Sequence, residues 1–172
     1  MKFSDQPQIV TCCVLSLAAL CAAGGVLAGP AEDVQQAESA LRSGDVYTAM
    51  SLLRKAADQN HPLAQAQLAD LLHAAEFDKE ALVLYQKSAE QGEPAGEFGL
   101  GRTYADGTGV PRDPALALQW YRKAEQKNHA PALDALARAY RTGDLGLTRD
   151  LDRANALDVR FRALSQAGKD AK

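Results

Sequence analysis

Few side chains in this sequence have the types and spacing that metal binding requires. The histidines are His61, His73 and His129, and His73 lies near the end of a predicted helix with Asp70 three positions before it. Two ligands do not make a metal site, because zinc sites use three or four protein ligands. We therefore interpret His73 as a solvated or turn-capping histidine, and we expect no metal or other cofactor.

Nucleophilic and phosphate chemistry also lack their usual motifs. The glycine pairs Gly107–Gly109 and Gly143–Gly146 could suggest a phosphate-binding loop, but neither follows a predicted strand or has the lysine of a P-loop. No serine lies in a nucleophile-elbow sequence. The residues therefore predict no catalytic site, and we expect the protein not to be an enzyme.

Residues 1–28 differ in composition from the rest of the chain. After a short polar start, Ile9–Ala28 is an uncharged apolar run of 20 residues. Two alternatives fit this run: a signal peptide cleaved before Gly29, or an uncleaved membrane anchor, because about 20 apolar residues span a bilayer. Both predict that the remainder is exported, either to the periplasm or facing it from the inner membrane. The membrane would then be contacted only through this segment.

All three cysteines, Cys12, Cys13 and Cys21, lie in the same segment, so no disulfide is expected in the remainder of the chain. Leu17–Cys21 approaches the lipidation box of bacterial lipoproteins, but Leu20 stands where a small residue is needed. We interpret the cysteines as small apolar residues of the leader.

Charge and composition narrow the function further. The chain has 22 acidic and 19 basic residues, a formal net charge of −3. Nucleic-acid binders carry a strongly basic face, so we expect no nucleic-acid partner. Alanine and leucine dominate and aromatic residues are few, which favours helices almost throughout.

The stretch from Pro94 to Ala132 predicts two helices joined by a glycine-containing turn. The residues that would pack the first helix and form the turn are Leu100, Gly101, Tyr104, Gly107 and Gly109. Asp113 is placed to cap the second helix, with Pro114 at its first position. The expected buried face of that second helix is Ala117, Trp120 and Tyr121.

The same pattern recurs along the chain. Ala117 matches Ala81 and Ala49 upstream and Ala154 downstream, with periods of 32 to 37 residues. We expect these alanines where two helices cross closely, because a larger side chain would overpack the crossing. One helical hairpin cannot bury its apolar faces alone, so neighbouring hairpins must stack on it.

We therefore predict an all-α fold, a right-handed α-solenoid of about four helical hairpins. The predicted boundaries are a linker at 29–33, hairpins at 34–62, 63–94, 95–131 and 132–165, and a polar tail at 166–172.

At Leu100–Ala124 the chain reads Leu-Gly-x-x-Tyr-x-x-Gly-x-Gly-Val-x-x-Asp-x-x-x-Ala-x-x-Trp-Tyr-x-Lys-Ala. This pattern resembles the Sel1-like repeat, a relative of the tetratricopeptide repeat. The first two hairpins lack the Gly-x-Gly turn and look more like tetratricopeptide repeats. The last hairpin departs from the pattern, with Leu157 where tryptophan and Asp158 where tyrosine would stand, and resembles a terminal cap.

The resemblance covers roughly residues 33–165. It implies a protein that holds other proteins, and it transfers no catalytic residues. We expect a non-enzymatic scaffold of the bacterial cell envelope that assists assembly of a secretion, polymer-export or membrane complex. The alternative is a small envelope hydrolase or ligand-binding protein of the kind claimed for some Sel1 relatives, although the Ser-x-x-Lys motif of β-lactam-binding proteins does not occur here.

The first helices of successive hairpins are expected to line a concave groove. The candidate partner-binding residues on these helices are Asp70, His73, Glu97, Arg102, Thr103, Arg138 and Arg141. The three arginines predict a basic patch over the last two hairpins. Such a patch would bind an acidic peptide, a protein terminus or an anionic polymer, but the same residues could also form an ordinary solvated helix face.

Overall fold

The computed structural model describes residues 29–170, which contain eight α-helices and no strand. The helices are α1 Pro30–Arg42, α2 Val46–Asp58, α3 Pro62–Ala74, α4 Asp78–Glu90, α5 Pro94–Asp106, α6 Pro114–Gln126, α7 Ala130–Thr142 and α8 Leu151–Asp170. The predicted all-helical fold is confirmed. The predicted leader at 1–28 lies outside the described residues, and no helix within 29–170 is long and apolar enough to cross a membrane.

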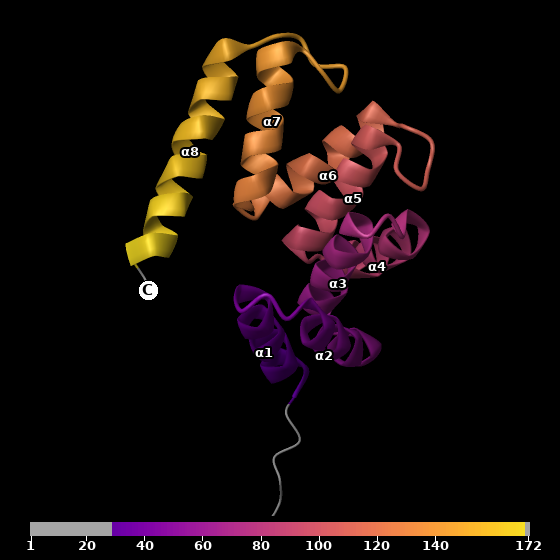
Figure 1. The fold of residues 1–172 in the computed structure, drawn as a ribbon. Coiled ribbons are helices and arrows are strands. Elements are labelled where there is room, and N and C mark those ends of the chain that lie inside the picture. The colour runs from indigo at the N-terminus through magenta and orange to yellow at the C-terminus, as the bar shows by residue number, and fades with distance from the viewer. Residues whose placement is uncertain (1–28, 171–172) are drawn as a thin grey trace, which may run out of the picture.

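Consecutive helices pair into four antiparallel hairpins, which we number 1 (α1 and α2), 2 (α3 and α4), 3 (α5 and α6) and 4 (α7 and α8). Each hairpin packs on the next in chain order, so the stack forms an α-solenoid (Figure 1). Five helices begin with proline at their first or second position, where the missing N–H leaves no hydrogen bond unmade.

Two boundaries differ from the prediction. The first helix begins at Pro30 rather than Val34, so residues 30–33 belong to α1 and not to a linker. Proline and the acidic Glu32 and Asp33 in the first turn favour a helix start, because acidic side chains complement the helix dipole there. At the other end α8 continues to Asp170, so residues 166–170 of the predicted tail are helical.

The turns within the hairpins explain the change of period along the chain. Hairpins 1 and 2 turn over residues 43–45 and 75–77, whereas hairpins 3 and 4 turn over 107–113 and 143–150. The long turns fold back onto the first helix, because the N–H of Asp113 donates to the carbonyl of Tyr104 at 2.9 Å. The equivalent bond in hairpin 4 joins Asp150 to Tyr140, also at 2.9 Å.

The small residues lie at the helix crossings inside the hairpins. Ala49, Ala117 and Ala154 are fully buried, and Ala81 is 1% exposed. A side chain on Gly101 would place its Cβ 2.7 Å from the ring of Tyr121, so α5 and α6 approach closely only because this position is glycine. Trp120 is half-buried, and the Nζ of Lys123 lies 3.7 Å from its ring centre.

Candidate binding groove

The seven candidate partner-binding residues all lie on first helices, but they do not form one surface. Asp70 and His73 are on α3, Glu97, Arg102 and Thr103 on α5, and Arg138 and Arg141 on α7. Asp70, Arg138 and Arg141 are exposed, and Arg102 and His73 are half-buried. His73 is occupied at the turn of hairpin 2, where its Nδ1 lies 2.6 Å from Oδ1 of Asp78.

The expectation that Glu97 and Thr103 face the groove is wrong, because both residues are 3% exposed. Glu97 points between α5 and the end of α6, where its Oε1 accepts a hydrogen bond of 2.6 Å from Lys127 Nζ. The hydroxyl of Thr103 donates to the carbonyl of Gly99, one turn earlier in α5, at 2.9 Å. Both side chains stabilise hairpin 3 from inside and cannot contact a partner.

Glu97 belongs to a buried position that repeats in every hairpin. The equivalent residues on the first helices are Asp33, Gln65, Glu97 and Leu133, each at most 3% exposed. Each of the three polar members pairs with the second helix of its own hairpin or the residue just after it: Asp33 with Lys55 at 2.9 Å, Gln65 with Gln91 at 2.8 Å, and Glu97 with Lys127. Partnering of this kind is what allows polar side chains to be buried.

The predicted basic patch is not an uncompensated positive surface. The three arginines pair with carboxylates as Arg102–Asp70 at 2.9 Å, Arg138–Asp134 at 3.2 Å and Arg141–Asp158 at 2.6 Å. Arg141 is directed at α8 by its partner, so only Arg102 and Arg138 remain in one groove. The prediction of a basic cluster of three arginines is therefore wrong.

Between hairpins 2 and 3 the packing is tight, and we call this contact the closed junction. Tyr85 of α4 is 1% exposed and lies against Gly99 of α5, where an added Cβ would come 2.2 Å from the ring. The Tyr85 hydroxyl donates to Asp70 at 2.7 Å and accepts from Arg102 at 2.6 Å. We call Asp70, Tyr85 and Arg102 the closed triad. Burial, followed by the nearby Asp70 carboxylate, raises the pKa of Tyr85 well above its usual value.

The same residue types recur 36 positions later between hairpins 3 and 4. Asp106, Tyr121 and Arg138 are the counterparts of the closed triad, and Ala135 is the counterpart of Gly99. Within residues 29–170 these three side chains make no hydrogen bond to one another, and Arg138 pairs instead with Asp134 on its own helix. We call this contact the open junction, and Asp106, Tyr121 and Arg138 the open triad.

The open junction contains a pocket of about 380 Å³ between α5 and α7, which we call the inner groove. The open triad and Ala135 line it. Two arginines, Arg102 and Arg138, face two aspartates, Asp106 and Asp144, so the formal charges of the lining cancel. Burial, followed by the Asp106 carboxylate, raises the pKa of Tyr121 to about 12, so its phenol is protonated at neutral pH.

Phe98 forms the aromatic part of the inner groove, but its ring is largely covered. Its centre lies 5.6 Å from the ring of Tyr121 and 5.4 Å from the ring of His129. The guanidinium of Arg102 lies 5.9 Å from the same ring centre. Burial lowers the pKa of His129, which therefore lies beside Phe98 as a neutral imidazole at neutral pH.

Sequence reasoning missed Asp106 and Ala135, and treated Tyr121 only as a packing residue. A signal was present, because Asp70, Tyr85, Gly99 and Arg102 each have a counterpart exactly one period later. Aligning those two sets pairs Gly99 with Ala135. That difference marks the junction where the pocket lies.

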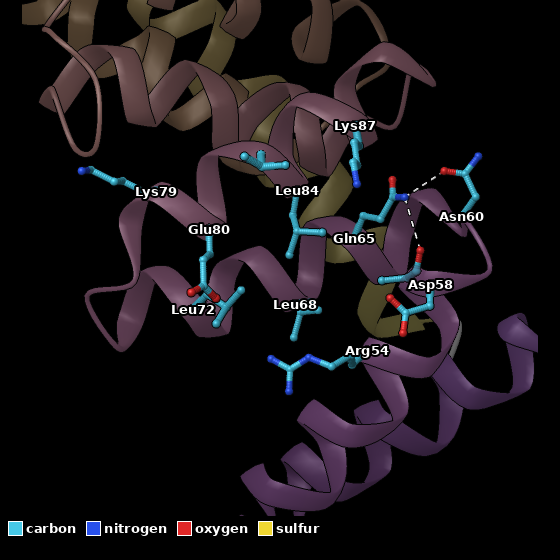
Figure 2. A pocket seen from close by; sticks show the side chains of 12 residues that line it. Arg54, Asp58, Asn60, Gln65, Leu68, Leu72, Lys79, Glu80, Leu84 and Lys87 are labelled. Carbon is cyan, nitrogen blue, oxygen red and sulfur yellow. Dashed lines mark hydrogen bonds between the residues drawn. The ribbon is translucent and has the colours of Figure 1, made fainter.

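A second groove, the outer groove, lies between α2 and α4 with α3 as its floor (Figure 2). It has a volume of about 660 Å³, with Leu68 and Leu72 among its lining residues. Arg54 enters it from α2 and Lys87 from α4, and in the described part of the chain neither forms a salt bridge. It is bordered by second helices, so it is distinct from the inner groove.

No group of three His, Cys, Asp or Glu side chains within residues 29–170 is arranged to hold a metal ion. The paired His73 and Asp78 have no third ligand nearby.

Comparison with solved structures places the chain among known solenoids. It is 27% identical to the Sel1 repeat protein of Oxalobacter formigenes, with a TM-score of 0.69 over 78% of this chain and 56% of that one. It is 25% identical to c5321, a protective antigen of uropathogenic Escherichia coli strains with an SLR fold, with a TM-score of 0.65 over 80% of this chain and 31% of that one. The chain thus spans about half and about a third of these two proteins.

A third match shows the fold alone. A proposed sel1 repeat protein of Klebsiella pneumoniae subsp. pneumoniae is 24% identical, with a TM-score of 0.70 over 79% of this chain and 68% of that one.

The sequence also matches the model of the Sel1 repeat over residues 41–61, 78–93, 94–129 and 130–157. These segments cover more than half of the chain; the last two begin with hairpins 3 and 4, and the first two cover α2 and α4. Sel1 repeats generally serve as protein–protein interaction modules, and their fold is typically a non-catalytic scaffold. The predicted resemblance is confirmed, and the chain belongs to the Sel1 repeat family.

Proposed function

We propose that this protein is a non-enzymatic interaction module of the bacterial cell envelope that holds a polypeptide partner in the inner groove. The observation that carries this proposal is the pocket at the open junction, which lies between the first helices α5 and α7. It offers charged and hydroxyl groups to a ligand at a junction whose counterpart between hairpins 2 and 3 is closely packed. The partner would be a component of a secretion, polymer-export or membrane complex.

The electrostatics of the inner groove favour a polypeptide over an anionic polymer. In the lining, Arg102 is paired with Asp70 and Arg138 with Asp134, and Asp144 is paired with Arg112. Asp106 forms no salt bridge within residues 29–170, so a polyanion would have to approach its carboxylate, and like charges close together repel. A polypeptide presents donors and acceptors of both kinds, which suits a lining of mixed charge.

Export is supported by the apolar run Ile9–Ala28 in the sequence. The repeats would then act in the periplasm, either free after cleavage or tethered to the inner membrane. Fractionation of cells, with protease added to spheroplasts, tests this. We expect the repeats to be digested only when the outer membrane has been opened, and resistance until the inner membrane is lysed would contradict export.

Site-specific photo-cross-linking tests the groove. Thr142 is exposed and lines the inner groove, whereas Lys87 is exposed and lines the outer groove. A photoreactive benzoylphenylalanine placed at Thr142 is expected to capture a discrete protein in living cells, and the same residue at Lys87 is the matched control. Capture from Lys87 alone, or from neither position, would contradict partner binding in the inner groove.

A further inference from the structure

We propose that the open triad binds a primary carboxamide side chain, an asparagine or glutamine of the partner, between Asp106 and Arg138. This inference rests on the proposed function and names the group that the inner groove recognises.

The closed triad shows what such an arrangement does when its polar groups are satisfied. A single neutral group, the Tyr85 hydroxyl, donates to the carboxylate of Asp70 and accepts from the guanidinium of Arg102, at 2.7 and 2.6 Å. Hydrogen bonds that involve a charged partner are stronger than bonds between neutral groups. Arg102 also contacts the Asp70 carboxylate directly, at 2.9 Å. A group placed between an Asp and an Arg in this way must be both donor and acceptor.

In the open triad the corresponding carboxylate of Asp106 and guanidinium of Arg138 are available to a ligand. The Asp106 carboxylate makes no salt bridge or side-chain hydrogen bond within the described residues. The Tyr121 hydroxyl, which corresponds to the Tyr85 hydroxyl of the closed triad, makes no hydrogen bond there either. Arg138 has only Asp134, four residues earlier on the same helix, and the two side chains are 65% and 45% exposed. Exposed pairs of this kind contribute little, so a ligand can take the guanidinium from Asp134.

The methyl group of Ala135 explains why the triad remains open. At the closed junction the equivalent residue is Gly99, and the Tyr85 ring lies so close to it that a Cβ there would come 2.2 Å from the ring. Ala135 lines the inner groove at the corresponding place, and its Cβ would not fit against a tyrosine ring as close as that of Tyr85 is to Gly99. The resulting space of about 380 Å³ has room for a side chain of the partner.

The chemistry of the lining selects the carboxamide. Its carbonyl accepts from an arginine and its NH₂ donates to a carboxylate, so one uncharged group satisfies both ends. A carboxylate would meet Arg138 but oppose Asp106, and an ammonium would do the reverse. A sugar would need an open aromatic face for stacking, and the Phe98 ring is already flanked by Tyr121 and His129.

The test is a titration of the ¹⁵N-labelled protein with blocked tripeptides, followed by amide chemical shifts. Acetyl-Ala-Gln-Ala-N-methylamide is expected to shift signals of α7 and the end of α5 and to saturate. In the methionine peptide, blocked in the same way, the side chain has similar length but no primary carboxamide, and in the glutamate peptide it carries a charge. The N-methylamide block leaves the glutamine side chain as the one primary carboxamide in the series. The methionine and glutamate peptides should both bind about tenfold more weakly, because the hydrogen bonds to charged groups are lost or opposed.

Matched variants locate the effect. Asp106→Leu and Arg138→Met should each abolish the preference for the glutamine peptide, and circular dichroism should show both folded, since both positions are exposed. Asp134→Asn removes the competing partner of Arg138 and should leave the preference intact or strengthen it.

Equal binding of the three peptides, a preference for glutamate, shifts confined to the outer groove, or binding of maltotriose in place of the peptides would each overturn the inference. So would the absence of any shift at millimolar peptide. These outcomes are separable from the proposed function, because capture of a protein from Thr142 would stand without any carboxamide preference.

Discussion

The closed and open junctions are built from the same residue types one repeat apart, yet one is sealed and the other holds a pocket. Tyr85 lies flush on Gly99, while Tyr121 lines a pocket together with Ala135. The glycines in the long turns of hairpins 3 and 4 also differ in how closely they approach the preceding hairpin. Gly109 approaches hairpin 2, where an added Cβ would lie 3.1 Å from the carbonyl oxygen of Asp78, but nothing lies within 4 Å of a Cβ at Gly146.

The difference shows how little separates a structural contact from a binding site in a repeat protein. A second glycine of α5, Gly96, lies against Ser88, where a Cβ would come 2.3 Å from the hydroxyl oxygen. Their counterparts one period later are Ala132 and Ala124, both fully buried. Glycines on α5 let helices of hairpins 2 and 3 touch, whereas α7 has alanines at the corresponding positions, and one of them, Ala135, lines a pocket.

The two tyrosine hydroxyls should differ most strongly in their effect on stability. Tyr85→Phe removes the two hydrogen bonds that the Tyr85 hydroxyl makes in the closed triad, and leaves the pair of Arg102 with Asp70. We expect it to lower the free energy of unfolding by about 1–3 kcal/mol. Tyr121→Phe removes a hydroxyl that bonds to nothing in the described residues, and should change stability by less than about 0.5 kcal/mol. Chemical denaturation of both variants makes the comparison, and equal losses would show that the triads are not different.

Adding a methyl group to the closed junction should convert it towards the open one. Gly99→Ala places a Cβ into the Tyr85 ring, and such overpacking costs about 1–3 kcal/mol, partly offset by the roughly 1 kcal/mol that alanine gains over glycine in a helix. We expect net destabilisation in thermal unfolding. The control is Gly29→Ala at the N-cap of α1, where nothing lies within 4 Å of a Cβ and the substitution adds no overpacking. Unchanged stability of Gly99→Ala would mean that the closed junction tolerates separation.

The reciprocal change should close the inner groove. Ala135→Gly removes the methyl that separates α7 from Tyr121, so hairpins 3 and 4 can approach as hairpins 2 and 3 do. We expect a change in stability within about 1 kcal/mol, because the helix loses propensity while the junction gains contact, together with loss of cross-linking from Thr142. If cross-linking from Thr142 is retained in Ala135→Gly, the partner does not depend on the pocket for binding.

The smallest effect is a dependence on pH centred on the open junction. Burial lowers the pKa of His129 below its usual value, so the unfolded state binds a proton more readily than the folded state. Stability from this residue is therefore present above about pH 6.5, the ordinary pKa of histidine, and is lost as the pH falls below it. Melting temperatures between pH 5 and 8 should show a shallower acid loss in His129→Gln, and identical profiles would contradict the assignment.

The architecture could be predicted from the sequence because it is written in local signals that repeat. Asp113 accepts from the N–H of Leu116 at 3.0 Å as an N-cap, and Asn128 adopts the left-handed conformation with φ 57°. Such signals act within a few residues, so they do not depend on how hairpins pack. Four copies then require stacking.

The candidate site was less predictable, because it depends on contacts between distant residues. Glu97 is exposed on any isolated helix, and it is buried here only because Lys127 reaches it from 30 positions away. Arg102 likewise is neutralised by Asp70, which is 32 positions earlier in the preceding hairpin. Helical periodicity predicts which residues share one face of a helix, but it does not predict which neighbouring element covers that face. Charged side chains exposed in a groove therefore could not be distinguished from charged side chains paired with another helix.

The buried position shared by Asp33, Gln65 and Glu97 has a consequence for how the array could change in length. Each of these side chains finds a partner inside its own hairpin, so duplicating or deleting a whole repeat would strand no carboxylate in the interior. The triads, in contrast, reach across from one hairpin to the next. Shuffled repeats would therefore fold with their internal pairs intact while gaining or losing pockets at the new boundaries, which gives the lineage a simple route to new specificities.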